Sequence, residues 1–204
     1  MHIAVSGNIA SGKTSLTEKL ADHYGWIPLF ESVDKNPYLA DFYDDMMKWA
    51  FHLQVYFLSS RFQHIRMIDQ HSGSVIQDRT IYEDAHVFAK NLHLSGLLND
   101  RDFLNYQELF NSMMSYVRPP DLLIYLKADV NKLAQQIQQR GRVFEKSIPL
   151  QYLENLNTLY RQWIEVYDLG KLLVVEVNKL DFVSSADDFS IIVDRIDSEL
   201  SGLS

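Results

Sequence analysis

The stretch Gly7-Asn8-Ile9-Ala10-Ser11-Gly12-Lys13-Thr14 matches the phosphate-binding pattern G-x-x-x-x-G-K-[ST] at every fixed position. The apolar run 2–6 before it predicts a short buried strand, and the run 15–21 after it predicts the start of a helix. A strand, a glycine loop and a helix N-terminus in this order direct backbone N–H groups at a polyphosphate. We therefore expect Lys13 to reach the β- and γ-phosphates of a nucleoside triphosphate and the Thr14 hydroxyl to ligate Mg²⁺.

Length and composition predict a single folded domain over residues 1–204. The chain is 47% hydrophobic, and no apolar run approaches the roughly 18–20 residues needed to span a bilayer. Because it lacks cysteine, disulfides and thiolate metal sites are excluded. The N-terminus enters the first predicted strand without a signal segment, so we expect a cytoplasmic protein that does not bind membranes. A net charge of −8 argues against a nucleic acid polymer as partner.

Strand-length apolar runs alternate with helical patterns along the whole chain. Strands are expected at 2–6, 26–30, 74–77, 122–126 and 172–177, and the longer helices at 48–70, 80–91, 100–116, 130–139, 149–168 and 186–200. This alternation predicts an α/β fold with a five-stranded parallel sheet that is covered by helices on both faces. Right-handed crossovers then place the functional site at the carboxyl ends of the strands.

Charged residues follow several of these strands. Glu31 comes after the second strand, Asp78-Arg79 after the third, and Arg140-Gly141-Arg142 after the helix that follows the fourth. Beside a phosphate loop, a carboxylate can hold Mg²⁺ or accept a proton, and an arginine can neutralise the moving phosphoryl group. Taken singly, the same residues also fit a solvated loop acid, a surface ion pair and a basic turn.

Gln54 and Arg61 are seven residues apart in the long helical segment 48–70, so they share one helix face. That face is otherwise rich in aromatic side chains. Polar groups among aromatic rings can read the edge of a planar ligand that is held by stacking. A partly exposed amphipathic helix would show the same pattern.

Taken together and in order, these motifs resemble the deoxynucleoside kinases, specifically the group that acts on deoxycytidine, deoxyguanosine and deoxyadenosine. The matching segments are 7–14, Glu31 with Asn36-Pro37-Tyr38, Gln54 with Arg61, 78–84, Arg140-Gly141-Arg142, Glu145 and 148–150. The resemblance runs over nearly the whole chain. It implies a P-loop kinase fold with a short lid at about 136–147, ATP-dependent phosphorylation of a deoxynucleoside 5′-hydroxyl with Mg²⁺, and a homodimer.

The resemblance also implies roles at the acceptor. Glu31 matches the general base for the 5′-hydroxyl, Arg79 the arginine beside that hydroxyl, and Lys13 the phosphate-loop lysine. Tyr43 and Glu145 match the residues that bind the sugar 3′-hydroxyl. Gln54 matches the residue that hydrogen-bonds the base edge, Phe88 the aromatic that packs on the base, and Arg61 with Asp84 an ion pair near the base.

At the donor, the resemblance assigns the phosphate loop, the lid and a late loop to ATP. The implied ATP-binding residues are Gly7, Asn8, Ala10, Ser11, Gly12, Lys13, Thr14, Ser15, Arg140, Arg142, Asp181 and Phe182. Thr14 and Asp78 match the residues at Mg²⁺. One position departs from the pattern, because Gln136 stands where the family lid often has a basic residue.

The base is less clear than the reaction. An Arg61–Asp84 pair disfavours thymidine and fits cytosine, adenine or guanine. Phe57 is bulky for a roomy purine pocket, whereas the short lid and compact length resemble small bacterial purine deoxynucleoside kinases. We expect deoxyadenosine or deoxyguanosine as acceptor, with deoxycytidine as the alternative.

Two other functions share some of these motifs. Asn178-Lys179-Leu180-Asp181 fits the guanine-reading motif of GTP-binding switch proteins, but the D-x-x-G match at 22–25 falls in the first helix, where it cannot sense a γ-phosphate. A thymidylate-type nucleoside monophosphate kinase shares the loop and lid. It would need further cationic groups for the acceptor phosphate, and Glu31 favours a neutral hydroxyl.

Overall fold

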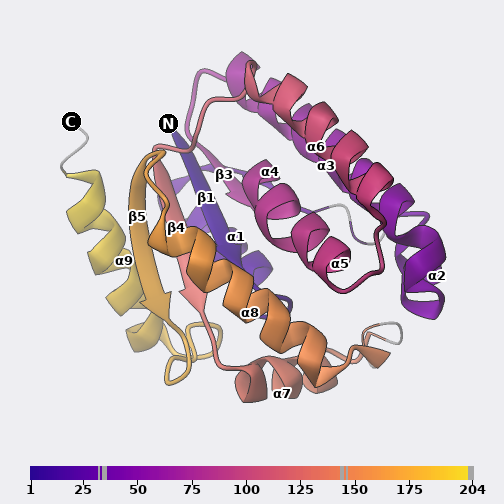
Figure 1. The fold of residues 1–204 in the computed structure, drawn as a ribbon. Coiled ribbons are helices and arrows are strands. Elements are labelled where there is room, and N and C mark those ends of the chain that lie inside the picture. The colour runs from indigo at the N-terminus through magenta and orange to yellow at the C-terminus, as the bar shows by residue number, and fades with distance from the viewer. Residues whose placement is uncertain (32, 34–35, 143–144, 146, 202–204) are drawn as a thin grey trace.

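The computed structural model contains one parallel sheet with the strand order β2-β3-β1-β4-β5 (Figure 1). It describes residues 1–31, 33, 36–142, 145 and 147–201. The strands are β1 (His2–Gly7), β2 (Ile27–Leu29), β3 (Val75–Asp78), β4 (Leu122–Lys127) and β5 (Lys171–Glu176). The predicted α/β fold with five parallel strands is confirmed. Part of the expected lid, at 143–144 and 146, lies outside the described residues.

Helices connect the strands and cover the sheet. They are α1 (Lys13–Tyr24), α2 (Leu39–Asp44), α3 (Met46–Gln70), α4 (Ile81–Glu83), the π-helix η1 (Asp84–Ala89), α5 (Lys90–Leu94), α6 (Asp100–Met114), α7 (Val130–Arg140), α8 (Leu150–Glu165) and α9 (Ala186–Leu200). In the part of the chain that the structure describes, none of these helices is long and apolar enough to cross a membrane.

Successive side chains of each strand point to opposite faces of the sheet, and a hydrophobic layer lies on each face. Ala4 of β1 and Tyr125 of β4 point into a core with α3, α6, α8 and the segment from α4 to α5. Ile3 of β1 and Ile124 of β4 point into the opposite core, with α1, α7 and α9. Such strands are buried on both faces, which explains why they read as continuous apolar runs. Figure 1 shows α8 and the α4–α5 segment crossing in front of the sheet.

The central position of β1 creates the site. β1 pairs with β3 on one side, where Val5 lies opposite Asp78, and with β4 on the other, where Gly7 lies opposite Leu126. The chain therefore winds in opposite directions from β1, and ligands of open parallel sheets bind at such a point, beyond the carboxyl ends of the strands. This topology places the phosphate loop after β1 beside Asp78-Arg79 after β3.

The predicted helix 80–91 differs from the observed structure. The residues instead form α4, then the π-helix η1 and then α5, which ends at Leu94. A π-helix has i→i+5 hydrogen bonds and is wider than an α-helix, and such segments are frequent at functional sites. Asp84 and Phe88, four residues apart in η1, both line the cleft described below. The widened turn therefore presents both side chains to one cavity.

Two glycines of the phosphate loop are required by close contacts. Gly7 has a φ of 149° and Gly12 a φ of 95°. A Cβ on Gly7 would lie 2.8 Å from the carbonyl oxygen of Leu126, and one on Gly12 would lie 2.7 Å from Cζ of Phe182. A side chain at either position would displace the loop, because these distances are shorter than van der Waals contact.

Candidate active site

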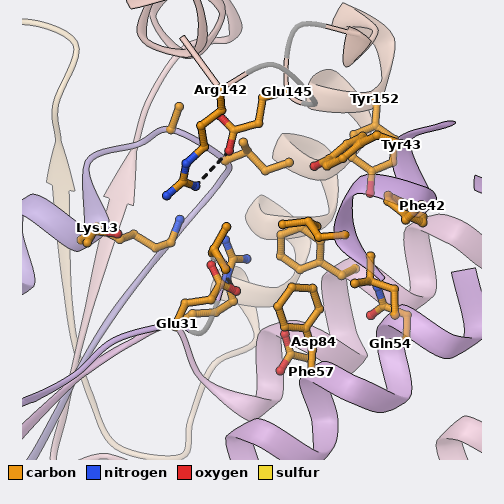
Figure 2. A pocket seen from close by; sticks show the side chains of 18 of the residues that line it. Lys13, Glu31, Phe42, Tyr43, Gln54, Phe57, Asp84, Arg142, Glu145 and Tyr152 are labelled. Atoms are coloured by element: carbon orange, nitrogen blue, oxygen red, sulfur yellow. Dashed lines mark hydrogen bonds and ion pairs between the residues drawn. The ribbon is translucent and has the colours of Figure 1, made fainter. Parts of the chain in front are cut away.

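A cleft opens beyond the carboxyl ends of the central strands. Apolar, aromatic and charged side chains together line it, as is usual for small-molecule sites. Its wall combines residues from the phosphate loop, the segment after β2, helices α2 and α3, the segment from β3 to η1, the lid and α8. They are Ile9, Ala10, Lys13, Thr14, Glu31, Val33, Leu39, Phe42, Tyr43, Leu53, Gln54, Phe57, Arg79, Asp84, Phe88, Arg140, Arg142, Glu145 and Tyr152. Figure 2 shows Lys13 and Arg142 toward one end and Gln54 and Phe57 toward the other.

The phosphate loop wraps the end of the cleft that holds Lys13. The Lys13 ammonium donates to the Asn8 carbonyl at 2.8 Å, and only 6% of the residue is exposed. Burial, with the nearby Arg79, lowers the pKa of Lys13 to about 8. Ala10 has a φ of 60°, a left-handed conformation that helps the loop to curl. Ser11 is buried in the loop, while Ser15 is half-buried in the first turn of α1.

Thr14 and Asp78 meet at the base of the loop. The Thr14 hydroxyl donates to Asp78 Oδ2 at 2.6 Å, and Asp78 Oδ1 is buried without a hydrogen-bond partner among the described residues. Burial raises the pKa of Asp78, which means that its carboxylate lacks compensation. A hydroxyl and an unsatisfied carboxylate oxygen beside a phosphate loop are hard ligands of the kind that Mg²⁺ prefers. The two residues therefore fit the predicted metal site.

Glu31 lies between two arginines. Its Oε1 is 2.5 Å from NH2 of Arg61 and 3.1 Å from Nε of Arg79. Burial raises the pKa of Glu31, but the charges of Arg79 and Arg61 outweigh this effect and hold it well below its usual value. Glu31 is therefore ionised at neutral pH, and its carboxylate is aligned by two guanidinium groups rather than solvated as a loop acid.

Arg79 is held on several sides in an uncommon backbone conformation. It has a φ of 70°, which non-glycine residues rarely adopt outside functional sites. Its NH1 donates to the Tyr160 hydroxyl at 3.2 Å, and its guanidinium carbon lies 4.3 Å from the centre of the Phe88 ring. Phe88, which the resemblance places against the base, thus also packs against Arg79.

The opposite end of the cleft can read a planar ligand. Gln54 is 2% exposed, and its Oε1 has no hydrogen-bond partner in the described ranges. Nε of Arg61 lies 3.4 Å from Asp84 Oδ2, and a role of this pair near a base stays a prediction. Arg61 is completely buried and contacts the residues of the cleft wall from behind, through Asp84, Glu31 and the ring of Phe57. Burial raises the pKa of Asp84 to about 7 despite the charge of Arg61.

The lid arginines converge on Glu145. NH1 of Arg142 lies 3.2 Å and NH1 of Arg140 3.6 Å from Glu145 Oε1. Figure 2 places Glu145 near Tyr43, above the centre of the cleft. Glu145 therefore connects the cationic lid to the region between the phosphate end and the planar end, where a sugar would lie. Tyr43 comes from α2, so the lid approaches α2 at this part of the cleft.

Asp181 and Phe182 lie outside the cleft wall. Asp181 accepts a hydrogen bond from the Ser184 amide at 3.2 Å, and Phe182 is buried against Gly12. Asn178 accepts from the Asp129 amide at 2.8 Å. Within the apparent guanine-reading motif, the Asn178 side chain thus bonds to the segment before α7, and the Asp181 side chain bonds within its own loop. Contact of Asp181 and Phe182 with adenine stays a prediction.

Glu83 and Tyr160 are residues that sequence reasoning missed. Both are completely buried, and both contact the phosphate loop at Gly7. Glu83 falls within the motif 78–84, and its spacing from Thr80 is that of a capping box, which the structure forms. That spacing predicts a helix start but not burial of Glu83 against Gly7. Tyr160 comes from α8, ten residues beyond the last of the lid-side motifs and outside all of them. Tyr152, also of α8, lines the cleft and could have been found only as an aromatic residue close to the lid.

Comparison with known proteins bears on this site. A family model described as deoxynucleoside kinase matches residues 3–201. The deoxyadenosine/deoxycytidine kinase of Bacillus subtilis is 38% identical over 96% of this chain and 91% of its own. The deoxyadenosine kinase of Dictyostelium discoideum is 43% identical over 89% of this chain and 74% of its own. A structure of M. mycoides deoxyadenosine kinase with the products dCMP and dCDP has a TM-score of 0.87 at 28% identity, covering 97% of this chain and 100% of that one.

Proposed function

The chain belongs to the deoxynucleoside kinase family, and from this premise we propose that it transfers the γ-phosphoryl group of ATP to the 5′-hydroxyl of deoxyadenosine or deoxyguanosine. The observation that carries the proposal is one cleft with a phosphate loop at one end, an ionised Glu31 in the middle and unsatisfied Gln54 at the other end. Family membership also decides against a GTP-binding switch and a thymidylate-type kinase.

The chemistry follows from the charges along the cleft. ATP would lie with its phosphates on the loop and Lys13, while the acceptor 5′-hydroxyl would lie against Glu31. The carboxylate accepts the hydroxyl proton as the new O–P bond forms and the bond to the leaving ADP breaks. Arg79 stabilises the negative charge on the transferred group from the acceptor side, and Lys13 does so from the donor side. Arg140 and Arg142 close over the donor phosphates.

Thr14 and Asp78 would hold Mg²⁺ in this arrangement. The metal supplies charge neutralisation between the β- and γ-phosphates when it is bound. No group of three or more His, Cys, Asp or Glu side chains that could hold a metal occurs among the described residues. The phosphates themselves would therefore complete the coordination, as is usual for Mg²⁺ at nucleotide sites.

Recognition of the base rests on Gln54, Asp84 and Phe88. An amide side chain can donate to one edge atom of adenine and accept from its amino group. The carboxylate of Asp84 offers a second acceptor, and the Phe88 ring offers a stacking surface. Thymine has no exocyclic amino group, so Asp84 would be left unpaired against it even where the thymine N3–H pairs with Gln54. The three proteins named above are deoxyadenosine kinases, which supports this choice. The Bacillus subtilis relative is also named for deoxycytidine, which is the alternative acceptor.

The acceptor spectrum tests the proposal. With ATP and Mg²⁺ we expect kcat/KM to be highest for deoxyadenosine or deoxyguanosine, lower for deoxycytidine and lowest for thymidine, with no transfer to the corresponding monophosphates. A Lys13→Met preparation controls for contaminating kinases. Activity confined to monophosphates would overturn the assignment of the reaction, and preference for deoxycytidine or thymidine would overturn that of the base.

We also propose that the protein is a homodimer and lies in the cytoplasm. Exposed apolar side chains lie on α3 (Met47 and Met67) and on α6 (Leu104 and Leu109), two helices that pack against each other. A second copy could cover them. A molar mass near twice 23.7 kDa in light scattering is the expected result, and a monomer at micromolar concentration would contradict it. Location in the cytoplasm agrees with the absence of cysteine.

A further inference from the structure

Glu83 joins two segments that are distant in sequence. Its Oε1 accepts from the Thr80 amide at 2.9 Å, and its Oε2 accepts from the Gly7 amide at 3.3 Å. Thr80 follows Arg79 directly, while Gly7 begins the phosphate loop. One completely buried carboxylate therefore connects the backbone of the phosphate loop to the backbone beside Arg79.

Tyr160 of α8 supplies a second connection between the same parts. Its hydroxyl lies 2.7 Å from Glu83 Oε2 and 2.8 Å from the Gly7 carbonyl, either of which can accept its proton. The Tyr160 hydroxyl oxygen also accepts a hydrogen bond from NH1 of Arg79 at 3.2 Å. Burial and the Glu83 carboxylate raise the pKa of Tyr160 well above its usual value, so the hydroxyl keeps its proton to donate. Its ring stacks on Tyr125 of β4 with centroids 5.7 Å apart.

The contacts of Arg79 differ in whether a bound ligand can reach them. The guanidinium has Glu31 at Nε and Tyr160 at NH1, and the face of Phe88 lies against it. Phe88 and Glu31 both line the cleft and are accessible to a ligand. Tyr160, by contrast, is absent from the cleft wall and completely buried. Glu83 is also completely buried outside the cleft wall, and its Oε2 lies 3.9 Å from NH1 of Arg79. Tyr160 and Glu83 are therefore the contacts of Arg79 that bound substrate cannot displace.

We propose that Glu83 and Tyr160 are positioning residues for phosphoryl transfer, which act by holding the Arg79 guanidinium at a set distance from the phosphate loop. The proposal rests on the role of Arg79 in the proposed reaction. During transfer the phosphoryl group lies between the phosphate loop and the acceptor hydroxyl. The phosphate loop and Arg79 must therefore contact it at the same time. A misplacement of about 1 Å can lower a rate by about 10²-fold.

Tyr160→Phe is the direct test, because it removes one oxygen and keeps the buried ring. We expect kcat to fall by about 10- to 100-fold, whereas KM for the deoxynucleoside changes less than about twofold. Tyr125→Phe is the matched control, since it removes a hydroxyl from the ring stacked on Tyr160, and that hydroxyl has no hydrogen bond within the described ranges. It should leave kcat unchanged. Thermal unfolding of each variant reports any loss of stability separately.

A double-mutant cycle with Arg79→Met separates the positioning role of Tyr160 from the role of Arg79 in the proposed reaction. If Tyr160 acts through Arg79, Tyr160→Phe lowers kcat in the wild-type background but has little further effect in Arg79→Met. Equal effects in both backgrounds, or a Tyr160→Phe variant with normal kcat, would overturn the positioning role. If Arg79→Met itself keeps normal kcat, the role of Arg79 fails instead. Glu83→Gln, which leaves an amide facing the Gly7 N–H, should reproduce the kcat loss.

Discussion

Replacing Arg79 by methionine is expected to lower kcat by about 10³–10⁵-fold, the range measured for arginines that neutralise a transferred phosphoryl group. The side chain lies in the cleft between Glu31 and the phosphate loop and is held by buried partners. A charge that is already fixed in a site of low dielectric stabilises the transition state, because no side chain or water has to reorient during the reaction. Single-turnover rates with saturating ATP and deoxyadenosine would measure the effect on chemistry.

Arg161→Met is the matched control for this variant, because Arg161 is exposed on α8 and lies outside the cleft wall. Its kcat should equal that of the unmodified protein. The expected loss for Arg79→Met is in kcat, with KM for ATP little changed. A loss confined to KM would contradict a transition-state role and would make Arg79 an ordinary binding residue.

Glu31→Gln is expected to lower kcat by about 10²–10⁴-fold, the usual contribution of a positioned general base. The amide is isosteric but cannot accept the proton of the 5′-hydroxyl. Because Arg79 and Arg61 hold the pKa of Glu31 below its usual value despite burial, the base form is present throughout neutral pH. In the unmodified protein, kcat limited by this group should therefore stay constant through neutral pH and fall only in acid.

The depressed pKa of Glu31 also predicts how the stability of Glu31→Gln depends on pH. A carboxylate whose pKa is depressed on folding stabilises the native state above its unfolded pKa, and this contribution is lost as the pH falls through the folded value. The variant should therefore be less stable than the unmodified protein at pH 7, with the difference narrowing in acid. Glu154→Gln on the exposed side of α8 is the control. A Glu31→Gln variant with near-normal turnover would show that another group or water takes the proton.

Several features could be predicted from local sequence. Each strand is a short apolar run between helical patterns, and the phosphate loop carries its own signature from Gly7 to Thr14. Parallel strands place their carboxyl ends at one edge of the sheet, so the proximity of Glu31, Asp78 and Arg79 followed from connectivity. The spacing of Gln54 and Arg61 placed both on one face of a helix, and both are buried there.

Other features depended on contacts between distant segments. In sequence, Glu83 has only the spacing of a helix-capping acid, yet it is buried against Gly7, 76 residues away. Tyr160 reaches the same glycine across 153 residues. Arg61 seemed a base-reading group by pattern, but in the fold it lies beneath Asp84 and also pairs with Glu31. No periodicity encodes such pairings, because a side chain's partner depends on how the elements pack.

The amino-acid sequence by itself determined the class of fold, the nucleotide loop and the set of charged residues that meet at the strand ends. These are consequences of local hydrophobic period, glycine conformation and chain connectivity, which act within one element or one crossover. Only the tertiary structure decided the strand order, the π-helix that aligns Asp84 with Phe88, and the buried connection from Glu83 and Tyr160 to Arg79. Those depend on the packing of α8 and η1 over the sheet, where the completely buried Glu83 and Tyr160 bond to each other and to the Gly7 backbone.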